Sequence, residues 1–179
     1  MFEFERELSP ESTMHLSQAA KQSVEQQQRD VYESHRHRTF SLAFYMTGNE
    51  IEAEEILATT FIRAFQQNER PDAFAVDSAL LGELSERFPL RKEEPAAVIS
   101  SGLPLSHGNV RRPDLEAAVR SLPANERLLF LLRDVEGYSA AAIARLLDLP
   151  EAQVRRACFS ARIRLSQILA AERARTEAA

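Results

Sequence analysis

The apolar residues of this chain recur at intervals of three and four along most of its length, which is the period of an α-helix. The clearest stripe consists of Ala53, Ile56, Leu57, Thr60, Phe61, Ala64 and Phe65. Asn49 precedes this stripe, and Glu52 follows Asn49 by three residues, which is the spacing of a capping box at a helix start. No stretch alternates apolar and polar residues as a half-buried strand does. The pattern therefore predicts an all-α protein.

Caps and breakers divide the rest of the chain into further helices. Gly48 is expected to end one helix and Pro89 another, because glycine favours helix ends and proline cannot continue a helix. Besides the helix after Asn49, the sequence predicts a weak helix at 14–24 and helices at 30–47, 76–87, 114–121, 124–136, 139–147 and 150 to about 173.

These helices fall into two groups. The segment 93–114 contains three prolines and two glycines and has no helical period, which is typical of a linker. We therefore expect two small helical domains, at 30–92 and 113–179, joined by a flexible linker at 93–112. Residues 1–29 are polar and rich in glutamine, and they are interpreted as an N-terminal extension.

The segment 138–156 predicts two helices that cross at a short turn. Ser139 can cap the first helix, and Pro150 suits the first turn of the second, where its missing N–H costs nothing. Ile143, Leu146 and Leu147 are expected to face inward. In the second helix the predicted buried stripe is Val154, Ala157, Cys158, Ala161, Leu165, Ile168 and Leu169, and the residues expected on the opposite side are Ala152, Arg155, Arg156, Phe159 and Ile163.

Two interpretations of this pair of helices remain open. In a helix-turn-helix the exposed residues early in the second helix enter the major groove of DNA, where arginine can donate to a guanine edge or bind phosphate. The alternative is a helical hairpin in a bundle, with Arg155 and Arg156 on a solvated basic face. The spacing of the residues alone does not distinguish the helix-turn-helix from the helical hairpin.

Charge narrows the choice of partner. The net charge of −5 argues against a protein that coats nucleic acid through bulk charge. The basic residues are distributed unevenly, however. From Asp114 onward there are ten arginines and nine acidic residues, whereas the preceding part holds twelve basic and eighteen acidic residues. The C-terminal half is therefore the better candidate for contact with phosphate.

Several other kinds of site are not supported by the sequence. The single cysteine, Cys158, cannot form an internal disulfide, and it lies on the predicted buried stripe. His35 and His37 would point to different sides of a helix, so we expect no metal site there. No nucleophile–base constellation or phosphate loop is present, so we expect neither an enzyme nor a cofactor. With no apolar run long enough to span a bilayer, membrane insertion is not expected and the protein is interpreted as cytoplasmic.

Two segments resemble a known family. SLPANERLLFLLRDVEGYSAAAIARLLDLPEAQVRRACFSARIRL, residues 121–165, resembles region 4 of the extracytoplasmic-function (ECF) sigma factors in the sigma-70 family. The residues that carry this resemblance are Leu122-Pro123, Arg127, Glu136-Gly137-Tyr138-Ser139, Ile143-Ala144, Leu149, Val154, Ala161-Arg162 and Leu165. VYESHRHRTFSLAFYMTGNEIEAEEILATTFIRAF, residues 31–65, is similar to region 2 through Gly48-Asn49, Ala53-Glu54-Glu55 and Thr60-Phe61.

The resemblance implies a promoter-specificity subunit of RNA polymerase. Region 2 would dock on the beta-prime clamp helices and open the minus-ten element, and region 4 would read the minus-thirty-five element and touch the beta flap. An anti-sigma factor is an expected further partner. The residues that this implies near DNA are Gln153, Arg155, Arg156, Phe159, Ser160 and Arg162, and those implied near core polymerase are Glu54, Glu55, Thr59 and Arg63.

The chain also departs from the family pattern. Leu80-Leu81 stands where the family has a Trp-Leu pair, and the family's basic minus-ten helix is replaced by SERFPLRKEE, in which Pro89 breaks the helix. Glu93-Glu94 adds negative charge where phosphate would lie. The alternative hypothesis is therefore a divergent sigma-like regulatory or interaction protein that keeps the fold but does not itself melt promoters.

Overall fold

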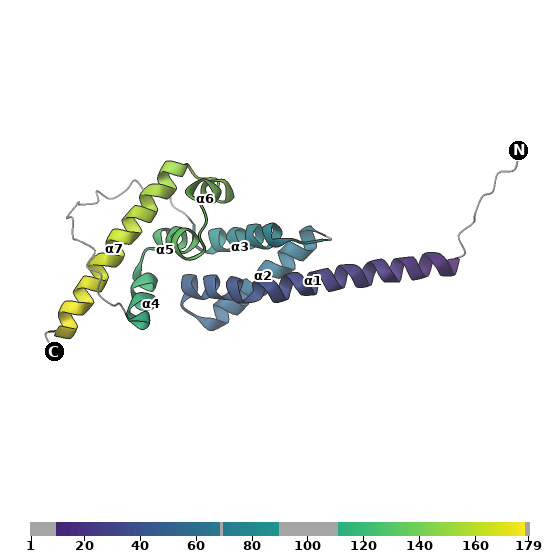
Figure 1. Ribbon diagram of the computed structural model, residues 1–179, viewed down its shortest axis with the longest axis horizontal. Coiled ribbons are helices and arrows are strands. Elements are labelled where there is room, and N and C mark those ends of the chain that lie inside the picture. Colours follow the sequence, from purple (N-terminus) through teal and green to yellow (C-terminus); the bar gives the residue numbers. More distant parts are fainter. Residues whose placement is uncertain (1–9, 69, 90–110, 178–179) are drawn as a thin grey trace, which may run out of the picture.

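The computed structural model describes residues 10–68, 70–89 and 111–177, with side chains from residue 21 to 176. Within these residues the chain is helical and forms no strand, which confirms the predicted all-α class. Figure 1 shows α1 and α3 running beside each other, α5 next to α3, and α7 on the far side of α5. The helices are α1 (Pro10–Thr47), α2 (Glu50–Gln67), α3 (Ala73–Arg87), α4 (Arg112–Ser121), α5 (Ala124–Phe130), the π-helical segment η1 (Leu131–Val135), α6 (Ala140–Leu146) and α7 (Glu151–Glu177).

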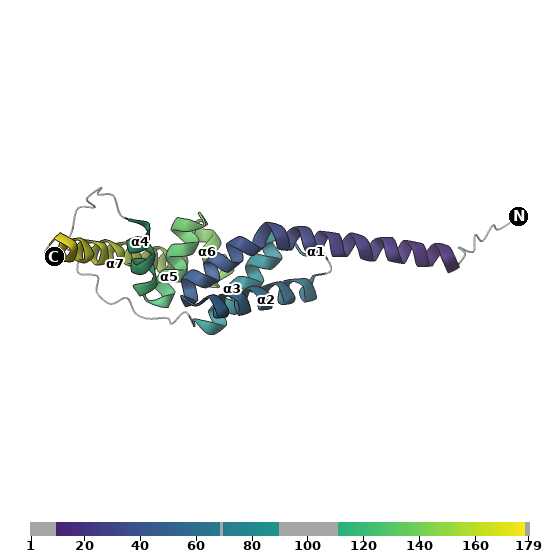
Figure 2. The same cartoon turned by 90° about the horizontal axis from the view of Figure 1, so that it is seen from below.

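Helix α1 is longer than the sequence predicted. It runs without interruption over 38 residues, whereas we expected a separate extension at 1–29 with only a weak helix at 14–24. After Pro10, a favourable first helical residue, the stretch to residue 29 contains no proline or glycine, and it is rich in Gln, Glu and Ala, which favour helices. Nothing therefore ends the helix before Gly48. Figure 2 shows its first half extending away from the other helices.

Side-chain caps define the next two helices. The Asn49 side chain accepts a hydrogen bond from the Ile51 amide at 2.9 Å, as expected for the start of α2. Asp72 accepts one from the Ala75 amide at 2.8 Å, so α3 begins at Ala73 and not at residue 76. Helix α3 ends at Arg87, two residues before Pro89.

The first C-terminal helices differ in detail from the prediction. Helix α4 begins at Arg112, with Pro113 in its first turn, so the helix starts inside the predicted linker. The rest of that linker, 93–110, lies outside the described residues. The single helix predicted at 124–136 is α5 followed by η1, where the Glu136 amide donates to the Leu131 carbonyl five residues earlier at 2.9 Å.

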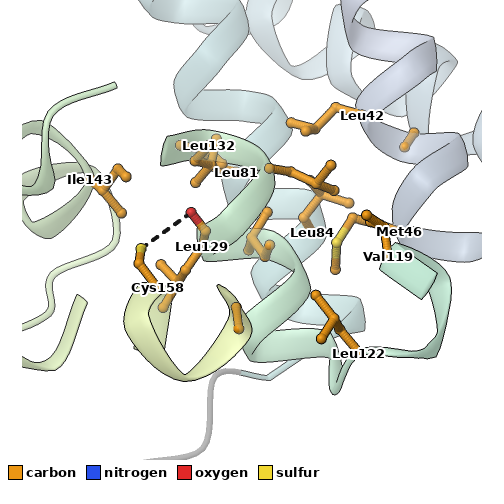
Figure 3. Close-up of a cluster of buried hydrophobic side chains, with 14 of the residues drawn as sticks. Leu42, Met46, Leu81, Leu84, Val119, Leu122, Leu129, Leu132, Ile143 and Cys158 are labelled. Carbon is orange, nitrogen blue, oxygen red and sulfur yellow. Dashed lines mark hydrogen bonds between the residues drawn. The ribbon is translucent and has the colours of Figure 1, made fainter. Parts of the chain in front are cut away.

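One apolar core joins the two halves of the chain. Buried residues of α1, α2 and α3 belong to the same cluster as buried residues of α4 through α7. Figure 3 shows Leu42 and Met46 of α1 and Leu81 and Leu84 of α3 beside Leu129 and Leu132. A second, smaller cluster around Phe61 and Val76 holds α1, α2 and α3 to one another. The predicted helical units are therefore in direct contact.

Candidate nucleic-acid interface

Helices α6 and α7 are joined by the short turn that the sequence predicted. The Ser139 hydroxyl accepts a hydrogen bond from the Ala142 amide at 3.1 Å and caps α6. At the end of α6 the backbone of Asp148 takes a left-handed conformation, with φ of 51°. This lets the Leu149 amide donate to the Ala144 carbonyl at 2.9 Å and reverses the chain before α7. Ile143 and Val154 are both fully buried and fix how the two helices cross.

Helix α7 has one buried side and one open side. Val154, Cys158, Ala161 and Leu165 are buried, while Ala157, Ile168 and Leu169 are partly buried against the same core. The thiol of Cys158 points to the Leu129 carbonyl of α5, 3.6 Å away (Figure 3). Ala152, Arg155, Arg156 and Phe159 are exposed, as the helical angle predicted, whereas Ile163 is half-buried and does not belong to the open face.

The open face combines two guanidinium groups with an apolar ring. The Arg155 Nε donates to the Glu151 carboxylate one turn earlier at 3.0 Å, and Arg156 Nε donates to the Ala152 carbonyl at 3.2 Å. Phe159 is 61% exposed. All three project from the first turns of a helix whose opposite side is fixed in the core, so this face can reach into a groove without moving the fold.

The other residues predicted to contact DNA are partly buried or already hydrogen-bonded within the protein. Gln153 and Ser160 are half-buried, and the Ser160 hydroxyl donates to the Glu126 carboxylate of α5 at 2.8 Å. Arg162 is exposed, but its Nε donates to Asp134 at 3.2 Å. The hydroxyl of Ser160 and the charge of Arg162 are thus already engaged within the C-terminal helices.

The residues implied near core polymerase do not share one open surface. Glu54 and Glu55 are exposed on α2, and Thr59 is half-buried. Arg63 is turned toward α3, where its two terminal nitrogens donate to Glu86 at 3.0 and 2.9 Å. This hydrogen-bonded pair raises the pKa of Arg63 and lowers that of Glu86. In this structure Arg63 joins α2 to α3.

A polar cluster between the halves was not predicted from the sequence. The Arg38 guanidinium of α1 donates to Asp77 of α3 at 2.6 Å, to the Tyr138 hydroxyl at 2.7 Å, and to the Glu136 carboxylate. The Tyr138 hydroxyl in turn donates to Asp77. Glu136 and Tyr138 were noted in the region 4 motif, but their shared partner Arg38 lies about a hundred positions away and Asp77 lies 61 positions from Tyr138, so no local spacing links them.

Arg127 of the same motif is also bound to the other half. One terminal nitrogen donates to the Met46 carbonyl at 2.8 Å and the other to the Leu122 carbonyl at 2.8 Å. Burial, assisted by the charge of Arg120, lowers the pKa of Arg127. The last carbonyls of α1 have no partner within the helix, and Arg127 supplies one for Met46.

Residues 112–165, which hold α4 to the first half of α7, match the family described as sigma-70, region 4. The ECF RNA polymerase sigma factor SigE of Mycolicibacterium smegmatis is 27% identical over 163 residues, and the match covers 79% of this chain. It spans only 61% of that relative's length.

A solved structure shows the same fold. The sigma factor RpoE of Bartonella quintana, in complex with the anti-sigma factor NepR, matches with a TM-score of 0.56 and 16% sequence identity. The match covers 79% of this chain and 95% of that one. The fold and the crossed pair α6–α7 define a helical protein with a sigma region 4 helix-turn-helix. Residues 112–165 thus match a sigma-70 region 4, and the chain as a whole is similar to an ECF sigma factor over 79% of its length.

No helix among the described residues is both long and apolar enough to cross a bilayer. Likewise, no group of three or more His, Cys, Asp or Glu side chains in this part of the chain is arranged to hold a metal ion.

Proposed function

We propose that this protein is a sigma factor that binds core RNA polymerase and directs it to promoters, reading the minus-thirty-five element through α7. The observation that carries the proposal is the open face of α7, where Arg155, Arg156 and Phe159 project opposite the buried seam. Arginine in such a position can donate two hydrogen bonds to guanine, and an aromatic ring can contact a thymine methyl group. No covalent chemistry is assigned to the protein.

The DNA-binding part of the proposal is tested with paired substitutions. A randomised duplex pool is first enriched on the wild-type protein, because the promoter is not specified by the fold. The affinity of the enriched duplex for the double variant Arg155→Ala/Arg156→Ala is then measured by mobility shift at a stated salt concentration. We expect affinity to fall at least about tenfold, since each arginine contact is worth on the order of 1 kcal/mol or more.

The chain offers a matched control. Arg111 and Arg112 are adjacent, exposed arginines at the start of α4, each paired with an acidic residue of the same helix. The variant Arg111→Ala/Arg112→Ala removes the same charge and should retain most of the affinity. Equal losses in both variants would show a general effect of net charge, and no loss in either would remove the role assigned to α7.

Run-off transcription tests the initiating activity itself. Purified core polymerase and a template carrying the enriched site upstream are combined with the protein. Transcripts that depend on the protein support the initiator. Core binding without transcripts supports instead a sigma-like regulator that does not melt promoters, which the break at Pro89 after α3 would explain.

A further inference from the structure

Glu126 is a buried carboxylate that joins α5 to α7. It is 9% exposed, and with Glu83 it makes up the buried acidic residues in the part of the chain that the structure describes. Its Oε1 accepts a hydrogen bond from the Ser160 hydroxyl at 2.8 Å and one from Arg164 Nε at 3.2 Å, and its Oε2 lies 3.0 Å from the same Nε. A buried carboxylate without partners is unfavourable, so Glu126 opposes any movement of α7 that takes Ser160 and Arg164 away.

The two partners of Glu126 lie on one flank of α7. Ser160 and Arg164 are four residues apart, which places them on the same side of the helix, one turn from each other. At about 100° per residue, Ser160 lies about 100° from the exposed Phe159 in one direction and about 100° from the buried Ala161 in the other. The contact is therefore beside the open face, and Glu126 itself stays inside the protein.

The buried seam of α7 constrains rotation of the helix only weakly. Three of its four buried residues, Val154, Cys158 and Ala161, have short side chains, and apolar burial has no preferred direction. A hydrogen bond, in contrast, weakens steeply when its distance or its angle departs from the favourable range. Glu126 therefore supplies the directional restraint that the seam lacks.

The rotation of α7 matters because base contacts depend on position. An α-helix with its side chains has a radius of about 5 to 6 Å, so turning it by about 10° moves the side-chain tips by about 1 Å. Hydrogen bonds span about 2.7 to 3.2 Å, so a shift of that size breaks a bond to a base edge. Phosphate contacts tolerate the same shift better, since they are mainly electrostatic. A loosely held α7 would thus keep phosphate binding and lose discrimination between base sequences.

Two other carboxylates hold arginines of α7 in a different way. Asp134 of η1 pairs with Arg162, and Glu151 pairs with Arg155 of its own helix. Glu151 turns with α7 and cannot fix its rotation. The Asp134 side chain is 23% exposed, compared with 12% for Glu126, and it holds one exposed arginine where Glu126 holds two residues. Exposed ion pairs contribute little free energy, so we expect Asp134 to restrain α7 less than Glu126 does.

We propose that Glu126 is a positioning residue for DNA recognition, which holds α7 at the rotation where Arg155, Arg156 and Phe159 face one groove. It acts through its two partners on α7 and sets the discrimination between base sequences, while the arginines supply the affinity for phosphate. The inference rests on the proposed function for its biological meaning. The restraint on α7 is a property of the free protein.

The positioning role is tested by comparing two duplexes of equal length. One carries the site enriched on the wild-type protein and the other the same bases in scrambled order, and both affinities are measured by mobility shift at a stated salt concentration. Glu126→Leu keeps a similar volume but accepts no hydrogen bond. We expect the ratio of the two affinities to fall about tenfold, as for the loss of one bidentate base contact. Affinity for the scrambled duplex should stay equal or rise, because Arg164 is freed for phosphate.

Two variants control for charge and for folding. Asp134→Asn removes the same charge and frees an arginine of α7, so it should raise both affinities alike and leave their ratio unchanged. Glu126→Gln keeps an acceptor for the Ser160 hydroxyl and should give a ratio between those of the wild type and Glu126→Leu. Circular dichroism should show unchanged helical content in each. A parallel loss of both affinities in Glu126→Leu would indicate general damage to the fold and overturn the positioning role.

Ser160→Ala separates positioning from a direct contact with DNA. In the wild-type background we expect the ratio to fall by a smaller factor, about threefold, as one neutral hydrogen bond is lost. In the Glu126→Leu background it should have no further effect, because the hydroxyl acts through the carboxylate. Equal losses in both backgrounds would overturn that route. Should Glu126→Leu not fold, unchanged ratios in Ser160→Ala and Glu126→Gln would overturn the proposal.

A measurement without DNA distinguishes this inference from the proposed function. Spin labels are placed at Ala117→Cys on α4 and Ala152→Cys on α7, both exposed positions, with Cys158→Ala to remove the native thiol. Double electron–electron resonance should give a narrow distance distribution that widens in Glu126→Leu and not in Asp134→Asn. If the wild type enriches no sequence while the distribution still widens, the proposed function alone fails. An unchanged distribution in folded Glu126→Leu would overturn the positioning role.

Discussion

Most arginines on the first four turns of α7 face a carboxylate of their own half. Arg155 pairs with Glu151, Arg162 with Asp134, and Arg164 with Glu126. Such pairs contribute little to stability at an exposed surface, but each places a negative charge where a phosphate would otherwise bind. Under the proposed function, the affinity of α7 for DNA depends on Glu151, Asp134 and Glu126 as well as on the arginines that they pair with.

Removing one of these carboxylates should strengthen binding. In Asp134→Asn the Arg162 guanidinium loses its ionic partner, and we expect affinity for duplex DNA to rise about two- to fivefold at low salt, in line with the energy of an exposed pair. Mobility shifts over a series of salt concentrations measure it. Asp30→Asn, which removes the same charge from α1, is the control, and an equal gain there would reduce the effect to net charge.

Cys158 should behave as a packing residue. It is 6% exposed, and burial together with the charge of Asp134 raises the pKa of its thiol. Since the thiolate is the reactive form, modification by Ellman's reagent at neutral pH should be at least about a hundredfold slower in the native protein than in denaturant. Reaction at the rate of a free thiol in native buffer would contradict the buried placement.

For single residues, the sequence predicted which side of a helix a side chain faces better than it predicted the side chain's hydrogen-bond partner. The helical angle placed Arg155, Arg156 and Phe159 outside and Val154 inside, because those positions follow from a single helix. It could not show that the Ser160 hydroxyl turns to Glu126, which lies 34 positions earlier on another helix. Contacts of that kind depend on how helices cross, and no local pattern encodes them.

The helix-turn-helix depends on its caps at both ends of α6. Gly137 has a φ of 77°, which other residues adopt only with strain, and it positions Ser139 to cap the helix. The first helix of the pair has only seven residues, Ala140–Leu146. So short a helix is not stable by itself, and its caps and packing hold it in place.

Loss of the Ser139 cap should therefore be measurable. We expect Ser139→Ala to lower the free energy of unfolding by about 1 kcal/mol and the melting temperature by about 2 to 4 °C, because the Ala142 amide loses its acceptor. Thermal unfolding followed by circular dichroism measures both. Ser41→Ala, at an exposed position inside α1, should be neutral or slightly stabilising. A melting temperature unchanged by Ser139→Ala would argue against the cap.

Helix boundaries were predictable where a cap or breaker marks them. Asn49, Gly48 and Ser139 gave helix ends within a residue or two. The continuity of α1 and the π-helical segment η1 were missed for opposite reasons. In α1 a polar sequence without apolar periodicity still favours a helix. In η1 the hydrogen bond from the Glu136 amide to the Leu131 carbonyl closes a wider turn, which the spacing of apolar residues does not mark.

Because both halves contribute to one core, we expect them to lose stability together. Met46→Ala should cost about 2 to 4 kcal/mol, as removal of a buried side chain usually does. Amide hydrogen exchange should then speed up in α3 and in α5 alike. Leu57→Ala, in the smaller cluster of α1–α3, should act mainly on the N-terminal helices. Faster exchange confined to α1–α3 in Met46→Ala would show that the halves unfold independently.

The sequence predicted the two helical units but not that they touch. Leu42 and Leu81 fit the core of the first unit, and Leu122 and Leu132 that of the second, so each unit looked complete. Apolar residues that pack within their own helical unit and apolar residues that pack against the other unit have the same spacing along a helix. The sequence pattern therefore does not tell the two apart. Only the packing of the helices against one another distinguishes a core that closes on itself from one that two units share.

Helix α1 has a practical consequence for measurements of size. Its 38 residues make a rod about 57 Å long at about 1.5 Å per residue, and much of the first half stands clear of the remaining helices (Figures 1 and 2). A particle with such a rod has a larger hydrodynamic radius and tumbles and diffuses more slowly than a sphere of 20.2 kDa. A single chain would therefore elute from a sizing column near the position of a globular pair, so its mass in solution has to come from light scattering or sedimentation equilibrium.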